Sequence, residues 1–465
     1  MNTASQVVVR FVMLIVTLVT IKLLANYLGA SGVGDYNTIT TYINFFIVIA
    51  DLGLFSVTVR EISKKPESEQ KIINNVFAIR LISALLAVLT AIFIVFLTKY
   101  SLDIKYGVII ASGFLFFNLL ASVYDSSLQY RLKMQFSALA ELISKIVSII
   151  ALILVIFFSG NFLWVMSTVA VFGVSIFIFK WLFAKRYVRF SPEMDSKVGP
   201  WIFQMAWPLG IVFIINNLFF KIDTLILYAF KGATVTGVYT VAYKVLEVTA
   251  FIGSYFSSAL KPVISQNIKN NSKYVGKVVE KGINIMVFAA TPIVISALVF
   301  SKDIILLISN AEFVSGAPAL IVLSFTLPLI FLVVLFLEVL IANDSRKTLV
   351  TISISILLFN VLLNLYMIPR YSLMGAAWTT LVSEILLVII YYIYANKVAR
   401  ISLNLKPAML SVLAGAISAY SGYIAYQSFN LHFIVPLVLM LLLFLALSSL
   451  FKTFSFKEIR ALVRS

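Results

Sequence analysis

Long apolar runs constrain the fold of this chain more than any other feature of its sequence. Of the 465 residues, 62% are hydrophobic and 12% are charged, about half the charged share of an ordinary soluble domain. A membrane span needs about 20 apolar residues, and only a helix pairs all of its backbone polar groups within such a run. The sequence therefore predicts an all-α polytopic membrane protein.

About fourteen apolar runs are long enough to cross a bilayer. They cover residues 7–28, 36–58, 76–98, 107–124, 138–158, 162–183, 207–230, 236–260, 282–300, 317–341, 348–368, 374–395, 408–426 and 432–451. The first run contains Lys22 and is followed by no small-residue cleavage site, so we expect a retained span rather than a signal peptide.

The loop charges predict the orientation of these spans. With the N-terminus inside, the inner loops and the C-terminal tail carry 23 lysines and arginines, and the outer loops carry 5. Because cytoplasmic loops are enriched in basic residues, we expect a multi-pass protein of the cytoplasmic (inner) membrane with both termini cytoplasmic. The same pattern accounts for the net charge of +17 without a nucleic-acid partner.

A glycine-rich hairpin occurs twice. Residues Gly29–Tyr36 match Gly232–Tyr239 at four of eight positions, at an offset of 203. Membrane hairpins reuse glycine and tyrosine, so the match alone leaves chance open. An even number of predicted spans separates the copies, and both hairpins would therefore face outward, as in a parallel repeat.

This repeat predicts the domain organisation. We expect an N-terminal six-helix lobe in residues 1–190 and a C-terminal six-helix lobe in residues 191–400. A polar stretch at residues 184–206 would link the lobes, since it contains two proline dipeptides, Ser191-Pro192 and Gly199-Pro200. Residues 401–465 would add two further spans and a basic cytoplasmic tail.

Several kinds of chemistry are excluded by composition. The chain has no cysteine and a single histidine, His432, so thiol catalysis, disulfides, histidine-based metal sites and Ser-His-Asp triads have no residues to support them. No loop is long enough for a folded domain outside the membrane. We expect a transporter rather than an enzyme, with no metal and no cofactor, although coupling to a gradient of H⁺ or Na⁺ stays open.

Charged residues inside the spans are the candidates for function, because a charge in the bilayer usually faces a cavity or a partner. Four charged residues lie within about two turns of the predicted inner end of their span. Their side chains could snorkel to the membrane interface, and Glu141 could pair with Lys145. They are Arg10, Arg80, Glu141 and Lys145. A deeper set is predicted to line a polar cavity, although Lys244 and Glu247 could neutralise each other. It comprises Lys22, Lys221, Asp223, Lys244 and Glu247.

The order of several short motifs resembles that of a known family. The first half has Leu28-Gly29 through Tyr36, Asp51-Leu52-Gly53 and Arg60-Glu61-Ile62. The second half has Lys221-Ile222-Asp223, Gly237-x-Tyr239, Lys261 to Ser265, Asn364 to Pro369, Gly375 to Trp378, and Ser383-Glu384. Together they resemble the polysaccharide transporters, which are the O-antigen and lipid-linked oligosaccharide flippases of the multidrug/oligosaccharidyl-lipid/polysaccharide superfamily.

The resemblance implies two lobes around a V-shaped cavity that alternates access, and a cargo of polyprenyl-pyrophosphate-linked oligosaccharide. It implies that cavity cations hold the pyrophosphate, and by position these are Arg10, Lys22, Lys221 and Lys244. Three carboxylates would couple an ion or balance charge: Asp51, Asp223 and Glu247. The expected partners are the lipid-linked cargo, membrane lipids, and glycosyltransferases or a polymerase of the same pathway.

Four other functions stay open at this stage. The two extra spans are similar to those of lipid II flippases. A multidrug/cation antiporter of the same superfamily would require a cavity dominated by carboxylates, whereas the deep set here is mixed. A membrane polysaccharide polymerase or ligase would need a sizeable outer loop with catalytic residues, which the sequence lacks. A pure scaffold would leave the deep charges unexplained.

Overall fold

The computed structural model describes residues 2–189, 191–195, 198–429 and 432–453, and all regular elements within these ranges are helices. The chain divides into two compact units, Met1–Gly237 and Val238–Ser465. The prediction of an all-α membrane protein is confirmed. The predicted boundaries after residues 190 and 400 are not tested by this division and stay predictions.

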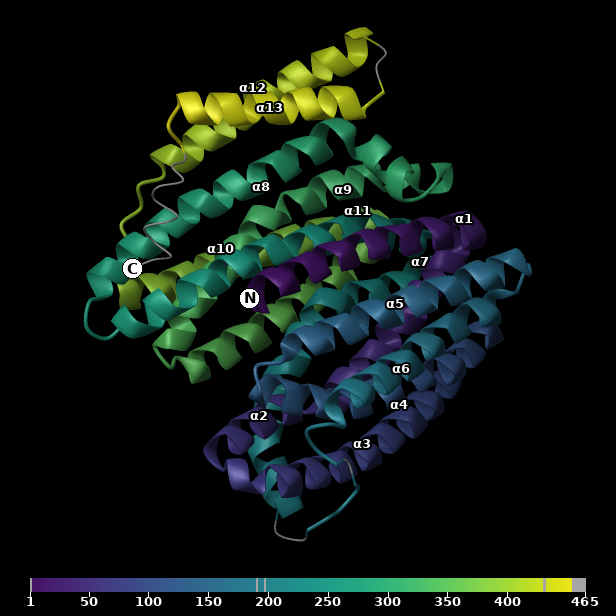
Figure 1. The fold of residues 1–465 in the computed structure, drawn as a ribbon. Coiled ribbons are helices and arrows are strands. Elements are labelled where there is room, and N and C mark those ends of the chain that lie inside the picture. The colour runs from purple at the N-terminus through teal and green to yellow at the C-terminus, as the bar shows by residue number, and fades with distance from the viewer. Residues whose placement is uncertain (1, 190, 196–197, 430–431, 454–465) are drawn as a thin grey trace. The chain divides into compact units, whose positions relative to one another are not determined.

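The first unit contains six helices and the first arm of a seventh (Figure 1). They are α1 (Asn2–Asp51), α2 (Leu54–Lys64), α3 (Glu69–Leu97), α4 (Leu102–Tyr130), α5 (Met134–Phe157), α6 (Phe162–Ala184) and α7 (Val198–Asn267), with a 3-10 turn at Pro66–Ser68. The second unit contains the second arm of α7 and six more helices. These are α8 (Ser272–Ile308), α9 (Ala317–Ser324), α10 (Thr326–Ala342), α11 (Arg346–Ala399), α12 (Lys406–Phe429) and α13 (Ile434–Leu450), with a 3-10 turn at Ala311–Gly316.

Ten helices in the described part of the chain are long and apolar enough to cross a membrane. Three of these ten exceed 50 residues: Val12–Lys64, Asn217–Asn267 and Lys347–Ala399. A straight 50-residue helix would extend about 75 Å, more than twice the hydrocarbon thickness. Each of the three contains a residue with non-helical backbone angles, at Gly29, Gly232 and Ser372 respectively. Helix α13 is shorter than the ten. The chain is therefore a multi-pass membrane protein, while the count of fourteen spans stays a prediction.

The breaks in α1 and α7 occur at the two glycines that the hairpin repeat places at equivalent positions. Gly29 has φ 64° and ψ −176°, and Gly232 has φ 78° and ψ −175°. This region of backbone conformation is essentially restricted to glycine. Figure 1 shows the first arm of α1 leading away from the N-terminus and the second arm leading back toward α2. The equivalent conformation of the two glycines is what the repeat predicts.

The two hairpins cross each other within the first unit, at a second pair of glycines. A Cβ atom added to Gly34 would lie 1.9 Å from the carbonyl oxygen of Ala233, and one added to Gly237 would lie 1.9 Å from that of Ala30. The contact is thus reciprocal, and it brings helix backbones together as small residues do in membrane proteins. Beside it, the hydroxyl of Tyr228 donates a 2.7 Å hydrogen bond to Asp35.

The core of the first unit lies where α1, α3 and α4 meet. Its fully buried side chains include Ile39 and Ile43 from α1, Ala91 from α3 and Leu115 from α4. Polar residues start helices at the ends of these apolar segments. Ser101 caps α4 by accepting from the Ile104 amide at 3.5 Å. Such caps satisfy amides that have no partner inside the helix, so these residues set where the spans begin.

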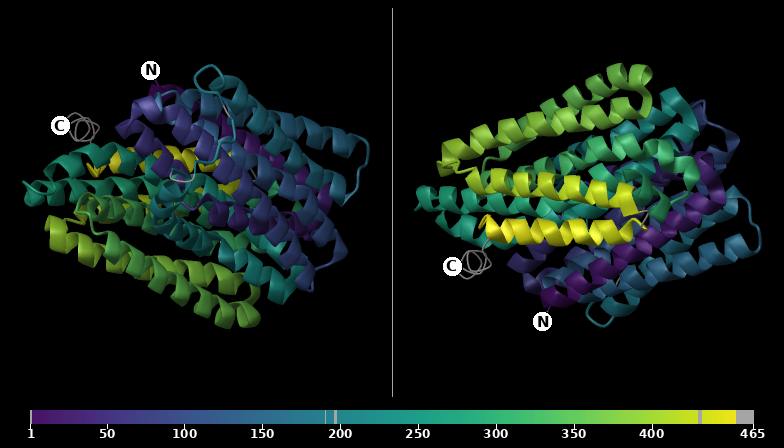
Figure 2. Two further views of the ribbon diagram at one scale, coloured as in Figure 1. Left: turned by 90° about the horizontal axis from the view of Figure 1, so that it is seen from below. Right: turned by 90° about the horizontal axis from the view of Figure 1, so that it is seen from above.

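In the second unit, the C-terminal helices α12 and α13 pack side by side and against α8 (Figure 2, right, where the pair is yellow). Their shared core contains Ile295 and Phe300 from α8, Ala414 from α12, and Met440 and Phe444 from α13. The rings of Phe288 and Phe444 stack at 5.3 Å. The two additional helices predicted from the sequence are therefore an integral part of this unit.

The glycine crossing predicts the effect of a single methyl group. Gly34→Ala would place its Cβ against the backbone of Ala233, which cannot move as a side chain does. We expect a loss of about 1–3 kcal/mol of stability, as is typical of overpacking. Thermal unfolding of the purified protein in detergent measures this loss.

Gly199→Ala is the matched control, because the nearest atoms to its added Cβ lie 3.8 Å away, at ordinary van der Waals distance. Its stability should stay within about 0.5 kcal/mol of the wild type. Equal melting temperatures for Gly34→Ala and the wild type would show that the crossing is looser than described.

Candidate functional site

The predicted cavity cations lie on helices α1 and α7. Lys22, on the first arm of α1, and Lys221, on the first arm of α7, are both half-buried in the first unit. Lys244 belongs to the second arm of α7 in the second unit. Arg10 lies in α1, but its side chain is outside the described residues. Because the set is divided between two units, its assembly into one cavity stays a prediction.

The ion pair that the sequence spacing allows between Lys244 and Glu247 in α7 is present. The ammonium of Lys244 lies 2.8 Å from a carboxylate oxygen of Glu247, one helical turn away. The two side chains are 28% and 41% exposed, so water still reaches both. An exposed pair of this kind contributes little to stability. Its ammonium can therefore be drawn to another anion at small cost.

Asp51 neutralises a buried arginine. Its carboxylate pairs with the guanidinium of Arg80, which is 1% exposed, and also accepts a hydrogen bond from the Gly53 amide at 3.2 Å. Arg80 donates a further 3.3 Å bond to the carbonyl of Ala50. The interpretation of Arg80 as a snorkelling residue is wrong, since the partner at the end of α1 holds it inside the unit. Asp51 thereby balances charge.

Asp223 is buried, with 4% of its surface exposed. Its carboxylate accepts a 2.7 Å hydrogen bond from the backbone amide of Thr224. The side chain lies on the first arm of α7, two residues from Lys221. An ion-coupling role for Asp223 and Glu247 stays a prediction.

A buried charge cluster joins α4, α5 and α6 in the first unit, and the sequence analysis missed its centre. The ammonium of Lys180 lies 2.6 Å from Asp125 and 3.5 Å from Glu141, and the lysine side chain is 5% exposed. Ser137 donates a 2.6 Å bond to the other oxygen of Asp125. Lys180 was visible as a charge inside the sixth apolar run, but periodicity gave no means of choosing its partners.

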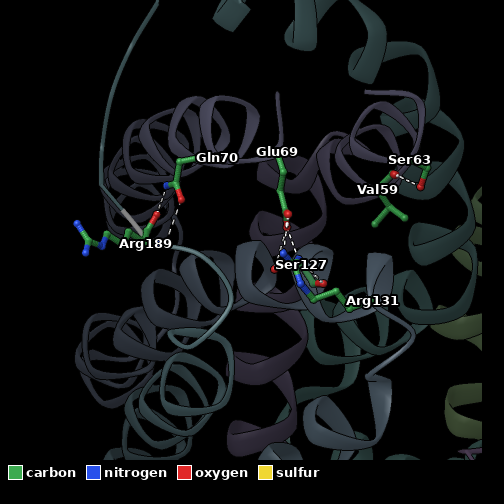
Figure 3. A network of polar contacts seen from close by, with 7 residues as sticks. All are labelled: Val59, Ser63, Glu69, Gln70, Ser127, Arg131 and Arg189. Atoms are coloured by element: carbon green, nitrogen blue, oxygen red, sulfur yellow. Dashed lines mark hydrogen bonds and ion pairs between the residues drawn. The ribbon is translucent and has the colours of Figure 1, made fainter. Parts of the chain in front are cut away.

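A second network joins the start of α3 to the end of α4 (Figure 3). Glu69, at the start of α3, accepts two bonds from the guanidinium of Arg131 at the end of α4, one of them at 2.6 Å. Ser127 bridges the two side chains, 3.0 Å from the arginine and 3.3 Å from the carboxylate. The hydrogen bonds that Arg131 donates to the Glu69 carboxylate raise the pKa of Arg131 above its ordinary value. The pair ties α3 to α4.

Taken together, the fold and these charges define a polytopic membrane protein with charged residues inside its helices. Comparison with known proteins gives the class. Residues 1–268 match the family described as "Polysaccharide biosynthesis protein", and residues 208–366 match the family described as "MatE". The first match covers more than half of the chain, which therefore belongs to the polysaccharide biosynthesis protein family of the multidrug/oligosaccharidyl-lipid/polysaccharide superfamily.

Individual relatives agree with this assignment. The chain is 24% identical over 262 residues to the capsular polysaccharide biosynthesis protein CapF of Staphylococcus aureus, a match that spans 55% of this chain and 66% of that protein. The fold of this chain is similar to that of the lipid II flippase MurJ in an inward closed conformation. The TM-score is 0.81, and the identity is 18% over 96% of this chain and 98% of the MurJ chain. An inward-facing multidrug resistance MATE transporter gives a TM-score of 0.66 with 13% identity over 84% and 97% of the two chains.

These likenesses confirm two predictions from the sequence. The family resemblance was correct, and the chain is a transporter of a flippase family rather than an enzyme. The structural neighbours share the fold at identities below 20%, so they do not identify the cargo.

The buried cluster generates a prediction about stability. Lys180→Met would leave Asp125, whose side chain is only 15% exposed, without its counter-ion, and we expect a loss of about 3–5 kcal/mol. Adding Asp125→Asn to Lys180→Met should recover part of this loss, because one uncompensated charge is removed. A double-mutant cycle by thermal unfolding measures the coupling.

The exposed pair of α7 is the matched control for this cycle. Lys244→Met should cost less than about 1 kcal/mol, since water solvates the Glu247 carboxylate that remains. Similar losses for Lys180→Met and Lys244→Met would show that the cluster in the first unit is as well hydrated as the exposed pair.

Proposed function

We propose that this protein is a flippase that moves a polyprenyl-pyrophosphate-linked oligosaccharide across the cytoplasmic membrane for the synthesis of a surface polysaccharide. The observation that carries the proposal is the presence of half-buried lysines inside apolar spans of a chain that belongs to a polysaccharide biosynthesis family. Both termini would lie in the cytoplasm, which the basic inner loops support.

The cargo determines what the cations would do. Pyrophosphate is the charged part of the lipid-linked sugar, and ammonium groups bind phosphate through charge-assisted hydrogen bonds that strengthen where water is scarce. Lys22, Lys221 and Lys244, together with Arg10, would hold this group while the prenyl chain stays in the bilayer. The saccharide would cross through the polar space between the lobes.

The mechanism would be alternating access of two lobes. A transport cycle requires that the head group bind the inward and outward states differently, since a ligand shifts an equilibrium only by its differential affinity. Both glycine hairpins are predicted to face outward. Opening of the protein toward the outside would therefore have to separate the two hairpins at their crossing or slide one past the other. A gradient of H⁺ or Na⁺, sensed by Asp223 or Glu247, would supply direction.

Two related functions differ in cargo. The similarity of fold to the lipid II flippase MurJ supports lipid II as the first alternative, because its charged head is also a pyrophosphate. A multidrug/cation antiporter is less well supported. Asp51 and Glu247 are each paired with a basic side chain, which leaves fewer acidic groups for a cationic drug.

Substitution of the cations tests the proposal. Lys22→Ala and Lys244→Ala should each reduce surface polysaccharide by at least tenfold, as expected when a charged hydrogen bond worth about 1.5–3 kcal/mol is lost. The corresponding arginine variants should keep part of the activity, because the positive charge remains. The test measures, in the host cell, the amount of surface polysaccharide and the amount of this protein in the membrane.

Lys273→Ala is the control, since this lysine is exposed in the first turn of α8. It should leave polysaccharide unchanged. Normal polysaccharide in both cavity variants would refute the site, and drug efflux lost with polysaccharide intact would favour the antiporter.

A further inference from the structure

Helix α11 folds back on itself in the second unit, and buried polar side chains lie where its two arms meet. Ser372 interrupts the helix with φ 55° and ψ −136°. A Cβ atom added to Gly375 would overlap the carbonyl group of Met367, so the arms are close at the turn. Further along, the side-chain amide of Asn360 donates a 3.0 Å hydrogen bond to the hydroxyl of Ser383 on the other arm. The two arms therefore form a packed hairpin.

Glu384, the next residue after Ser383, is buried in this α11 hairpin without a partner. Only 1% of its surface is exposed. Its Oε2 atom is enclosed by the protein and has no hydrogen-bond partner, and its carboxyl group forms no ion pair within the described part of the chain. Other acids inside the spans, such as Asp51 and Glu247, pair with basic side chains. Glu384 is therefore an exception among them.

The helices that pack against α11 supply no counter-ion near the middle of the span. These helices are α8, α9 and α10. Helix α9 has no ionisable side chain, and the one such residue of α10, Glu338, lies 3.4 Å from the ammonium of Lys261. Helix α8 has ionisable residues only toward its two ends: Lys273, Tyr274, Lys277, Glu280, Lys281, Lys302 and Asp303.

The other ionisable groups of this region are neutral, paired or distant along the chain. Tyr391 lies seven residues after Glu384 on the same face of the second arm, and a phenol is uncharged near neutral pH. The basic residues of α11 lie near its ends or beside its turn: Arg346, Lys347, Arg370 and Lys397. The second arm of α7 packs against α10 through a 3.1 Å bond from Ser257 to the carbonyl of Val334, and the Lys244 and Glu247 side chains of that arm pair with each other.

Depth in the membrane determines the charge that Glu384 can carry. It lies ten residues after the start of the predicted span 374–395 and eleven residues before its end. An ionised carboxylate in that position, removed from water and without a counter-ion, is strongly unfavourable. A neutral carboxylic acid has no charge to be compensated, and its burial costs far less. The carboxyl group also makes no bond that would hold α11 to its neighbours, so packing alone does not account for an acid there.

We propose that Glu384 is a proton-binding site of this protein. In this structure its side chain is the neutral acid. When water enters the α11 hairpin in another conformation, the O–H bond breaks, the proton passes to water, and the remaining carboxylate is solvated. The proton binds the buried state more tightly than the hydrated state, and it therefore shifts the equilibrium between them. The site is separate from Asp223 and Glu247. Its coupling to cargo movement rests on the proposed function, whereas proton binding itself does not.

Infrared spectroscopy of the purified full chain tests the protonation state. A protonated carboxyl group has a C=O stretching band that an ionised carboxylate lacks. The wild type should show this band for a buried acid at neutral pH, and Glu384→Gln should lose it. Glu338→Gln is the matched control from the same unit, because the Glu338 side chain is 12% exposed and faces Lys261. It should keep the band. An unchanged band in Glu384→Gln would overturn the proposal.

Melting temperatures separate a proton site from a structural role. Glu384→Leu removes the acid and keeps a side chain of similar volume. Because no bond is lost, its melting temperature in detergent should equal or exceed that of the wild type. Melting temperatures well below the wild type in both Glu384→Leu and Glu384→Gln would show that the carboxyl group stabilises the fold, and would overturn the assignment.

The pH of the medium tests the coupling in the host cell. A gradient of one pH unit can drive up to about a tenfold difference in concentration. Surface polysaccharide of wild-type and Lys273→Ala cells should therefore fall as the medium becomes alkaline, whereas Glu384→Gln should give a low amount that does not change with pH. A wild-type pH response in Glu384→Gln, or loss of the wild-type response when Na⁺ is replaced at constant pH, would overturn the coupling. The infrared result is independent of the cargo, so a failure of the proposed function is distinguishable from a failure of this site.

Discussion

Every polar group that this chain places in hydrocarbon must find its partner within the chain, and the structure depends on that constraint. Backbone groups meet it by forming helices almost without interruption. Where α1 and α7 must turn, a glycine takes a conformation that other residues avoid, and helix resumes at once. Side-chain charges meet the same constraint by pairing, as Arg80 does with Asp51 and Lys180 does with Asp125.

The basic side chains inside the spans therefore form two groups that differ in their ability to bind a cargo anion. Arg80 and Lys180 are buried and bound by carboxylates, so they hold helices together and have little freedom to bind cargo. Lys22, Lys221 and Lys244 are only half-buried, and Lys244 belongs to a pair that water reaches. Cargo recognition requires the second kind, because an anion must be able to compete for the cation and then to leave.

Interactions outside the predicted site also position the segment before α7. Gln70, Asn74 and Asn75 of α3 accept hydrogen bonds from the backbone amides of Arg189, Ser191 and Asp195, which holds these described residues of the linker against α3.

The sequence by itself determined the helical membrane fold, the approximate positions of the apolar runs, the recurrence of the glycine hairpin and the family. These follow from local composition and short spacing, which the bilayer converts directly into helices. The pairing of Lys244 with Glu247 was accessible for the same reason, since one helical turn separates them. Only the tertiary structure decided that Gly34 meets Ala233, that Arg80 is buried against Asp51, and that Lys180 binds Asp125. Those partners lie 29 to 199 positions apart, and which helix faces meet depends on packing that no local pattern encodes.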